Sequence, residues 1–215
     1  MKIAIINYEM GNVKSVENAF KSIGADTITT ADVQTVRCCS AVVLPGVGAF
    51  RDAVNNLEKL NLRRTVIGII SENRPFLGIC IGLQVLFSYG TEGGKHPGLD
   101  VFKGSVEKIS GGGGIKIPHM GWNRINILKN ESRLFKGIRQ DESFYFVHSF
   151  HVKPKDRDIV SSVTGYGTEI VSSVEKANCF GVQFHPEKSS ICGIEILRNF
   201  SDIALEYEKQ GFKSI

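Results

Sequence analysis

The chain has 215 residues, of which 42% are hydrophobic and 22% are charged, and its formal net charge is +4. This length gives one large domain or two small ones, with a composition in the ordinary range of folded proteins. The sequence has no run of five basic residues and no apolar stretch near the ~18 residues of a membrane span, so neither nucleic acid nor a membrane is an expected partner.

Short apolar strands alternate with helical patterns in the first half of the chain. The predicted strands are Lys2–Asn7, Ala41–Leu44 and Pro75–Ile79. The predicted helices are Asn12–Ile23, Ala49–Leu60, Arg64–Glu72 and Gly82–Tyr89. Continuous apolar strands between helices favour a parallel sheet that is covered on both faces.

After Gly90 the pattern changes to closely spaced strands, which we expect to pair antiparallel. These strands are Val101–Ser110, Gly121–Leu128, Ser143–Lys153, Ile159–Thr164, Ile170–Lys176 and Cys179–Phe184. A final helix is predicted over Ile191–Tyr207, and Gly111–Gly114 is predicted to be a flexible hairpin tip. No linker separates the two halves, so residues 1–215 are expected to form a single α/β domain with an antiparallel extension.

The segment Pro75–Leu86 reads PFLGICIGLQVL and contains the most informative residues of the chain. Cys80 has one glycine two positions before it and another two positions after it, between a predicted strand and a predicted helix. Such glycines let the backbone turn sharply and keep Cβ atoms away from the sulfur. The thiol would then lie at a helix N-terminus, where the helix dipole favours the thiolate. The pattern predicts a nucleophile elbow, and the alternative is a buried structural cysteine.

A cysteine nucleophile needs a base within hydrogen-bond reach and an acceptor that orients this base. Among the five histidines, His185 is the best candidate because an apolar strand leads to it and Pro186 ends that strand. Glu187 follows two residues later and can bond one ring nitrogen while the other faces the sulfur. The order Cys80, His185, Glu187 therefore predicts a catalytic triad, although an isolated His-Pro-Glu is more often a surface turn.

The loop Pro45–Phe50 reads PGVGAF and follows a predicted strand. Its glycines would serve a tight turn, or they would free a backbone N–H to stabilise an oxyanion together with the N–H of Ile81. No metal or organic cofactor is expected, because the histidines and cysteines lack zinc-type spacing and no phosphate-binding or dinucleotide motif is present. The five cysteines suggest no disulfide framework, so a reducing cytoplasm is the expected location.

Several motifs occur together over nearly the whole chain, from its start to about residue 200. They are Gly11-Asn12, PGVGAF at Pro45–Phe50, GICIGLQ at Gly78–Gln84, PHMGWN at Pro118–Asn123, YFVHSF at Tyr145–Phe150 and GVQFHPEKS at Gly181–Ser189. In this order they resemble the triad-type (class I) glutamine amidotransferases, and more closely the glutaminase subunits of imidazole glycerol phosphate synthase. The resemblance implies a flavodoxin-like, mostly parallel sheet flanked by helices, with an antiparallel extension in the second half.

The resemblance also implies a reaction with glutamine as substrate. Cys80 would attack the side-chain amide carbon and form a glutamyl thioester. His185 would protonate the departing ammonia and then activate water, while Glu187 would hold its tautomer. The residues expected to frame the oxyanion and the bound glutamine are Val47, Gly48, Ile81, Gln84, Glu92 and Ser149.

A partner subunit follows from the same resemblance. Ammonia would pass to a (βα)8-barrel cyclase, which would form a heterodimer with this chain and make imidazole glycerol phosphate and AICAR in histidine biosynthesis. The positions expected at the face that meets the barrel are Asn12, Met120, Trp122, His148 and Lys188. For Trp122, ordinary core packing is the alternative.

Three other functions remain open from the sequence. Phe150 and His151 stand where the family usually has tyrosines, which leaves room for a paralogue that feeds ammonia to another synthase, such as one amidating a surface sugar. A free-standing Cys-His-Glu hydrolase would have no need of the PHMGWN and YFVHS motifs. An inactive docking scaffold would have no need of all three triad residues.

Overall fold

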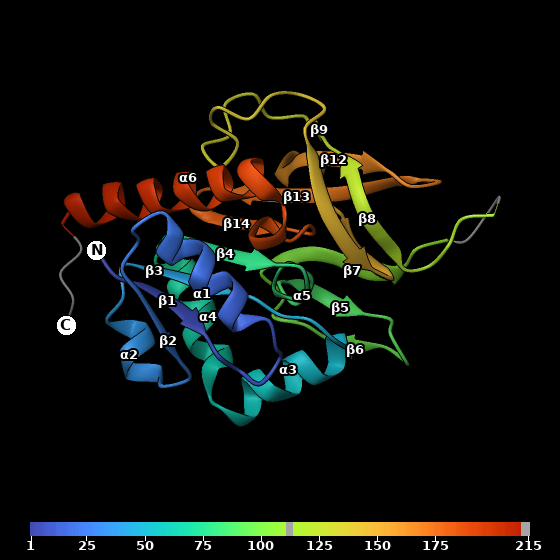
Figure 1. Cartoon of the computed structure of the whole chain (residues 1–215). Coiled ribbons are helices and arrows are strands. Elements are labelled where there is room, and N and C mark those ends of the chain that lie inside the picture. Colours follow the sequence, from blue (N-terminus) through green and yellow to red (C-terminus); the bar gives the residue numbers. More distant parts are fainter. Residues whose placement is uncertain (111–113, 212–215) are drawn as a thin grey trace.

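The computed structural model describes residues 1–110 and 114–211 (Figure 1). Strands and helices alternate at first, as β1 (Ile3–Ile6), α1 (Val13–Ser22), β2 (Thr27–Thr30), α2 (Val33–Arg37), β3 (Ala41–Leu44), α3 (Phe50–Lys59), α4 (Leu62–Ser71), β4 (Phe76–Ile79) and α5 (Ile81–Gln84). Strands then dominate, as β5 (Phe87–Gly90), β6 (His96–Pro97), β7 (Phe102–Lys108), β8 (His119–Arg124), β9 (Asn126–Ile127), β10 (Ser143–His148), β11 (Phe150–Pro154), β12 (Val160–Gly165), β13 (Glu169–Lys176) and β14 (Cys179–Val182). Two short 3-10 helices, Arg157–Ile159 and Pro186–Lys188, and the long α6 (Ser190–Lys209) complete the described chain.

The main sheet has eight strands in the order β2-β1-β3-β4-β14-β13-β12-β9. The strands from β2 to β14 pair in parallel, whereas β14, β13, β12 and β9 pair antiparallel. The α/β class and the antiparallel extension predicted from the sequence are therefore confirmed. Because β14 returns from far along the chain to pair with β4, the residues that follow these two strands meet at one edge of the sheet.

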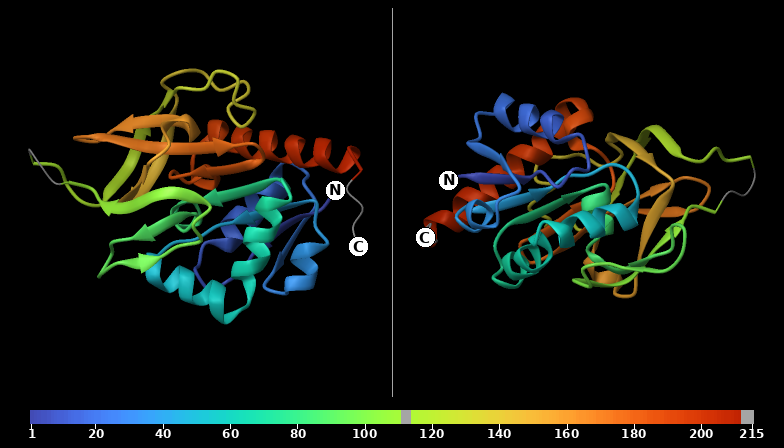
Figure 2. Two further views of the ribbon diagram at one scale, coloured as in Figure 1. Left: turned by 180° about the vertical axis from the view of Figure 1, so that it is seen from behind. Right: turned by 90° about the horizontal axis from the view of Figure 1, so that it is seen from below.

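Alternating residues of the strands bury opposite faces of the main sheet. Ile3 and Ile5 belong to a core with Val16 of α1 and Phe200 of α6. The intervening residue Ala4 belongs to a second core on the other face. The right-hand view of Figure 2 shows α1 and α6 on one side of the sheet and α3 and α4 on the other. Helices on both faces explain why the central strands read as continuous apolar runs.

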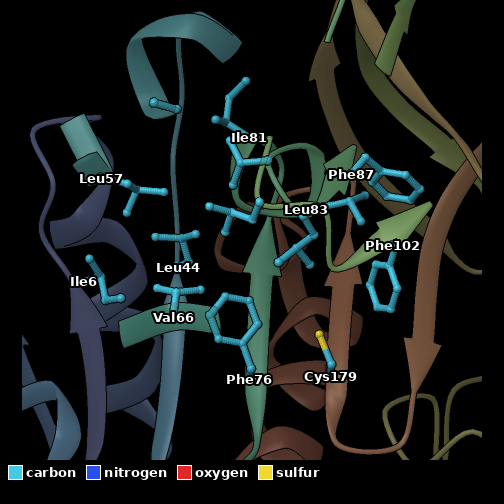
Figure 3. Close-up of a cluster of buried hydrophobic side chains, with 14 of the residues drawn as sticks. Ile6, Leu44, Leu57, Val66, Phe76, Ile81, Leu83, Phe87, Phe102 and Cys179 are labelled. Atoms are coloured by element: carbon cyan, nitrogen blue, oxygen red, sulfur yellow. The ribbon is translucent and has the colours of Figure 1, made fainter. Parts of the chain in front are cut away.

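Two smaller sheets lie beside the main one. The first pairs β10 with β8, and the second has the order β11-β7-β5-β6. The aromatic rings of Phe87 and Phe102 in the second sheet join the core that contains Leu83 and Phe76, as Figure 3 shows. This core anchors the segment just after Cys80 to both sheets.

The predicted helix over Gly82–Tyr89 is wrong beyond its first turn. The chain forms only the single turn α5 and then enters β5. The reason is hydrogen bonding to a distant segment, because the N–H of Leu99 donates to the carbonyl of Val85 at 2.7 Å and that of Phe102 to Leu86 at 3.0 Å. With so few aligned peptides, the dipole expected to act on the thiol is correspondingly small.

The predicted strand Ser143–Lys153 is two strands. β10 pairs with β8, and β11 pairs with β7 in a different sheet. The break falls at Ser149, whose carbonyl accepts a hydrogen bond from the N–H of Ile109 at 2.9 Å. The predicted strand Gly121–Leu128 is likewise divided, into β8 and β9. Residues 111–113 of the predicted Gly111–Gly114 tip lie outside the described residues.

The sequence pattern missed two elements near the N-terminus. β2 has the sequence TITT and is half-buried at the edge of the sheet, so it lacks the apolar pattern of a core strand. α2 is only five residues long and is recognisable from its cap, because the Asp32 carboxylate accepts a hydrogen bond from the N–H of Thr35 at 2.7 Å. In the two described ranges, no helix combines the length and apolar character needed to cross a bilayer.

Candidate active site

Cys80 lies on a strained turn between β4 and α5. Its backbone has φ 53° and ψ −105°, in a region that non-glycine residues rarely adopt. Its N–H donates to the carbonyl of Val182 in β14 at 2.8 Å, and its carbonyl accepts from the N–H groups of Leu83 and Gln84 at 3.1 Å. These bonds hold the strained residue in place and connect the turn to the strand that leads to His185.

The two glycines that flank Cys80 are required by close backbone contacts. A Cβ atom on Gly82 would lie 1.8 Å from the carbonyl oxygen of Leu44, at the end of β3. A Cβ atom on Gly78 would lie 2.5 Å from the carbonyl oxygen of Gly82. Neither position has room for a side chain, so the turn forms only with glycine at both.

His185 and Glu187 form a buried pair beside this turn. The Nδ1–H of His185 donates to Oε1 of Glu187 at 2.7 Å, and both side chains are at most 1% exposed. The same carboxylate oxygen accepts a hydrogen bond from Nδ2 of Asn12. The backbone N–H of His185 donates to the carbonyl of Tyr145 at 2.9 Å. The imidazole is thus fixed with its Nε2 away from Glu187.

The protonation of His185 depends on its two neighbours. Burial lowers the pKa of His185, but the Cys80 sulfur and the Glu187 carboxylate raise it by more, so that it lies at about 10. Its Nε2 has no hydrogen bond of normal geometry to another described residue, yet the sulfur is near enough to influence the ring electrostatically. The arrangement therefore favours the protonated, imidazolium form of His185.

Cys80 lines a cavity of about 340 Å³. This size suits a bound amino acid. The lining residues are Val47, Gly48, Cys80, Ile81, Gln84, Glu92, Pro118, Val147, His148, Ser149 and Phe150. All the residues that the sequence analysis predicted for the oxyanion and substrate therefore lie around one cavity with Cys80, and their individual roles remain predictions.

The N–H of Val47 does not point into the cavity as an oxyanion donor would. It donates to the carbonyl of Met10 at 2.9 Å. Since one N–H cannot serve that carbonyl and a developing oxyanion together, in this conformation Val47 does not supply the loop N–H that was predicted to act with Ile81. The contact with Val47 has no signal in the sequence, because it uses the backbone carbonyl of Met10.

Two candidate substrate-binding side chains are held by the protein itself. One carboxylate oxygen of Glu92 accepts the N–H of Phe50, the first residue of α3, at 2.9 Å. Gln84 is 2% exposed and donates both N–H bonds of its amide to protein acceptors. Both side chains are therefore pre-oriented at the cavity wall.

The predicted partner-facing residues separate into exposed and buried ones. Met120 and Trp122 on β8 are 62% and 55% exposed, and Lys188 is also exposed, with its Nζ 5.9 Å from the centre of the Tyr145 ring. The exposure of Trp122 contradicts the alternative of core packing. The side chain of Asn12 instead donates a hydrogen bond to Glu187, and His148 is buried in the cavity wall.

His148 belongs to a buried histidine cluster behind the cavity. Its Nδ1–H donates to the carbonyl of Phe150 at 2.9 Å, so its Nε2 accepts from Nδ1 of His119 at 3.0 Å. Burial lowers the pKa of His148 to about 3 and those of His119 and His151 to about 4. The three rings are therefore neutral at pH 7. Among the described residues, no three histidine, cysteine or acidic side chains are grouped to hold a metal ion.

This cluster predicts acid sensitivity of the fold. Because the folded-state pKa values of His119, His148 and His151 lie below the ordinary 6.5, the unfolded chain binds more protons between pH 6.5 and 4. The contribution of these three rings to the free energy of unfolding should be fully present above pH 6.5 and be lost as the pH approaches 4, by about 1–2 kcal/mol for each ring at pH 5.

Urea unfolding at pH 7.5 and pH 5 measures this loss of stability. His119→Gln should reduce the difference between the two pH values, whereas His96→Gln, a histidine outside the cluster, should leave it as in the wild type. An unchanged difference in the His119 variant would show that the cluster does not cause the acid sensitivity.

Sequence reasoning missed two further side chains at this site. The Nε2 of Gln183 donates to the Cys80 sulfur at 3.6 Å. Tyr8 is fully buried beneath the PGVG loop, where a Cβ atom on Gly46 would lie 2.3 Å from its hydroxyl. Burial, and secondly the charge of Cys80, raise the pKa of Tyr8. Gln183 lies inside the GVQFHPEKS motif and could have been proposed from its place two residues before His185.

Comparison with known proteins gives a consistent result. Residues 4–203 match the family model described as "Glutamine amidotransferase class-I". The chain is 48% identical to the imidazole glycerol phosphate synthase subunit HisH of Methanothermobacter thermautotrophicus, over 94% of this chain and 98% of that protein. It is 44% identical to the HisH subunit of Moorella thermoacetica, over 94% of both chains.

Solved structures share the fold at lower sequence identity. The structure of PurLQS from Thermotoga maritima has a TM-score of 0.69 at 18% identity, covering 96% of this chain and 98% of that chain. The glutaminase domain of a Trypanosoma brucei CTPS with bound acivicin has a TM-score of 0.65 at 16% identity, covering 100% of this chain and 96% of that chain.

Proposed function

The chain belongs to the class-I glutamine amidotransferase family, and on this premise we propose that Cys80, His185 and Glu187 hydrolyse the side-chain amide of glutamine. It is a glutaminase subunit of the imidazole glycerol phosphate synthase type and serves histidine biosynthesis. The observation that carries the proposed residue roles is the buried His185–Glu187 pair beside Cys80, which lies on a strained turn and lines a cavity.

The proposed reaction has two steps. The Cys80 thiolate attacks the amide carbon, and the His185 imidazolium gives its Nε2 proton to the departing ammonia, which leaves a glutamyl thioester. The neutral His185 then takes a proton from water as this water attacks the thioester, and glutamate is released. Glu187 keeps the proton on Nδ1 throughout and so holds Nε2 ready for both transfers.

The position of the Val47 N–H supports dependence on a partner. In the described conformation the N–H of Val47 is bonded to the carbonyl of Met10 and is not available to an oxyanion. We propose that docking of a (βα)8-barrel cyclase subunit, as a heterodimer, releases this N–H towards the cavity. The exposed Met120 and Trp122 side chains of β8 suit such a docking face. The ammonia would pass to the cyclase within the complex, in the cytoplasm.

Glutamate release tests this function directly. We expect slow glutamine hydrolysis by the chain alone, and an increase of ~10²–10³-fold when the cyclase and its nucleotide substrate are added, since one oxyanion donor contributes about that factor. Fast turnover by the isolated chain would instead support a free-standing hydrolase. No turnover in the complete complex would contradict the proposed function, provided that the cyclase remains active with ammonium salts.

A further inference from the structure

A continuous chain of side-chain amides leads from a backbone carbonyl to the catalytic sulfur. The Nε2 of Gln84 donates to the carbonyl of Phe150 at 2.9 Å and to Oε1 of Gln183 at 3.1 Å. The Nε2 of Gln183 in turn donates to Sγ of Cys80 at 3.6 Å, within the range of hydrogen bonds to sulfur. Gln183 is completely buried and Gln84 is 2% exposed, so water does not compete for these bonds.

The Phe150 carbonyl determines which amide atoms donate in this series of hydrogen bonds, because a carbonyl can only accept. The Gln84 atom that faces it must therefore be the amide nitrogen. The second N–H of that nitrogen needs an acceptor, so Gln183 presents its oxygen to Gln84 and its nitrogen to the sulfur. The opposite amide orientations would place oxygen against oxygen at the Phe150 end, and an oxygen lone pair against the sulfur at the other.

The Phe150 carbonyl is itself held in place. It accepts a second hydrogen bond from Nδ1 of His148 at 2.9 Å, and His148 is bonded to His119 behind it. At the other end, the backbone N–H of Gln183 donates to the carbonyl of Ser172 in β13 at 2.8 Å. Both ends of this series of hydrogen bonds are thus anchored on strands, which leaves the side-chain amide of Gln183 little freedom to turn.

An N–H directed at sulfur favours the thiolate over the thiol. A thiol sulfur is a weak acceptor, whereas a thiolate accepts a hydrogen bond strongly, so the donor stabilises the charged form. The single turn of α5 contributes only a small dipole at Cys80, so a fixed N–H is the more substantial source of this stabilisation.

We propose that Gln183 is a positioning residue for the nucleophile, because its amide holds the Cys80 sulfur towards the cavity and favours the thiolate. The proposal rests on Cys80 being the nucleophile of the proposed function. Its experiment must therefore report on the sulfur without needing glutamine turnover.

The test is the pH dependence of Cys80 alkylation by iodoacetamide, measured by peptide mapping in wild type and in Gln183→Met. Methionine keeps the length of the side chain and removes the N–H. The pH midpoint of alkylation should rise by about one unit, which is a tenfold loss of thiolate at a given pH below it. Gln140→Leu, which removes another bonded glutamine amide remote from the site, should leave the midpoint unchanged.

A second variant covers the case in which Gln183→Met fails to fold. Gln183→Leu also removes the N–H that faces the sulfur and introduces neither a charge nor a new donor, so its midpoint should also rise. A folded variant of either kind with an unchanged or lowered midpoint overturns the proposal. In the complex with the cyclase, the same variants should lose kcat with little change in KM and regain part of it at higher pH.

Glutamine turnover and the alkylation midpoint of Cys80 distinguish the proposed function from the role of Gln183. If the complete complex turns over no glutamine but the midpoint still shifts, the proposed function is wrong while the interaction of Gln183 with the sulfur stands. If turnover is normal and the midpoint does not move, Gln183 serves packing alone.

Discussion

Cys80→Ala is expected to reduce glutamine turnover by ~10⁴–10⁶-fold in the complex with the cyclase, because deleting a covalent nucleophile removes the whole thioester route. The fold should remain, since alanine adds no atoms to the turn and the backbone bonds to Val182, Leu83 and Gln84 do not use the sulfur. Glutamate release measured in single-turnover and steady-state assays detects a loss of this size.

Cys39→Ala is the matched control for this change. Cys39 is also buried, but it precedes β3 and lies at the opposite end of the parallel strands from Cys80. Its removal should leave kcat within about twofold, since it touches no residue of the cavity. Substantial glutamate release by the Cys80 variant would rule out the thioester mechanism.

Gly82→Ala is expected to prevent the elbow from forming and to destabilise the whole fold. The added Cβ would lie 1.8 Å from the carbonyl oxygen of Leu44 and 2.9 Å from its carbonyl carbon, and backbone atoms cannot move aside as a side chain could. Separating β3 from α5 would disrupt the packing of Leu44 and Leu83 in one core. We expect a loss of more than about 3 kcal/mol in the free energy of unfolding, at the upper end of single substitutions.

Gly68→Ala gives the opposite expectation at a glycine with space around it. Gly68 lies within α4, and a Cβ atom there would meet nothing within 4 Å. Alanine in a helix is favoured over glycine by about 0.5–1 kcal/mol, so this variant should be slightly more stable than the wild type. Urea unfolding of both variants measures the contrast. Equal midpoints for Gly82→Ala and wild type would show that the turn tolerates a side chain.

The chemistry of the site could be predicted from the sequence because it depends on short local patterns. Gly78 and Gly82 around Cys80 indicated a crowded turn, and Pro186 after His185 indicated a strand end. The structure places both features where β4 and β14 pair in parallel, which brings residues over one hundred positions apart to the same edge. Neither pattern alone specified this pairing.

The errors in the predicted fold have a common physical cause, which is hydrogen bonding to distant segments. The apolar residues after Gln84 are compatible with a helix or a strand. The hydrogen bonds that Leu99 and Phe102 donate to this segment end the helix and lead the chain into β5. Similarly, nothing in the run Ser143–Lys153 shows that its two halves join different sheets. Polar β2 carries no apolar pattern because it lies at the edge of the sheet.

The orientation of the Val47 N–H was also beyond the sequence. The residues predicted to frame the oxyanion do lie at the cavity, but the direction of the Val47 N–H depends on the backbone carbonyl of Met10. The Gln183 amide chain likewise depends on orientations that no spacing rule contains. Sequence motifs located the side chains, and tertiary contacts determine what each of them donates or accepts.

Labelling with an electrophilic diazoketone analogue of glutamine measures most directly whether Cys80 is the nucleophile of a glutamine site. The thiolate would displace nitrogen gas from the analogue after its carbon is protonated, which leaves a stable thioether that peptide mapping locates among the five cysteines. Cys179 is buried, and its raised pKa keeps it as an unreactive thiol. We expect one adduct, on the peptide that contains Cys80, and protection by excess glutamine. An adduct on another cysteine, or labelling that glutamine does not slow, would contradict the proposed active site.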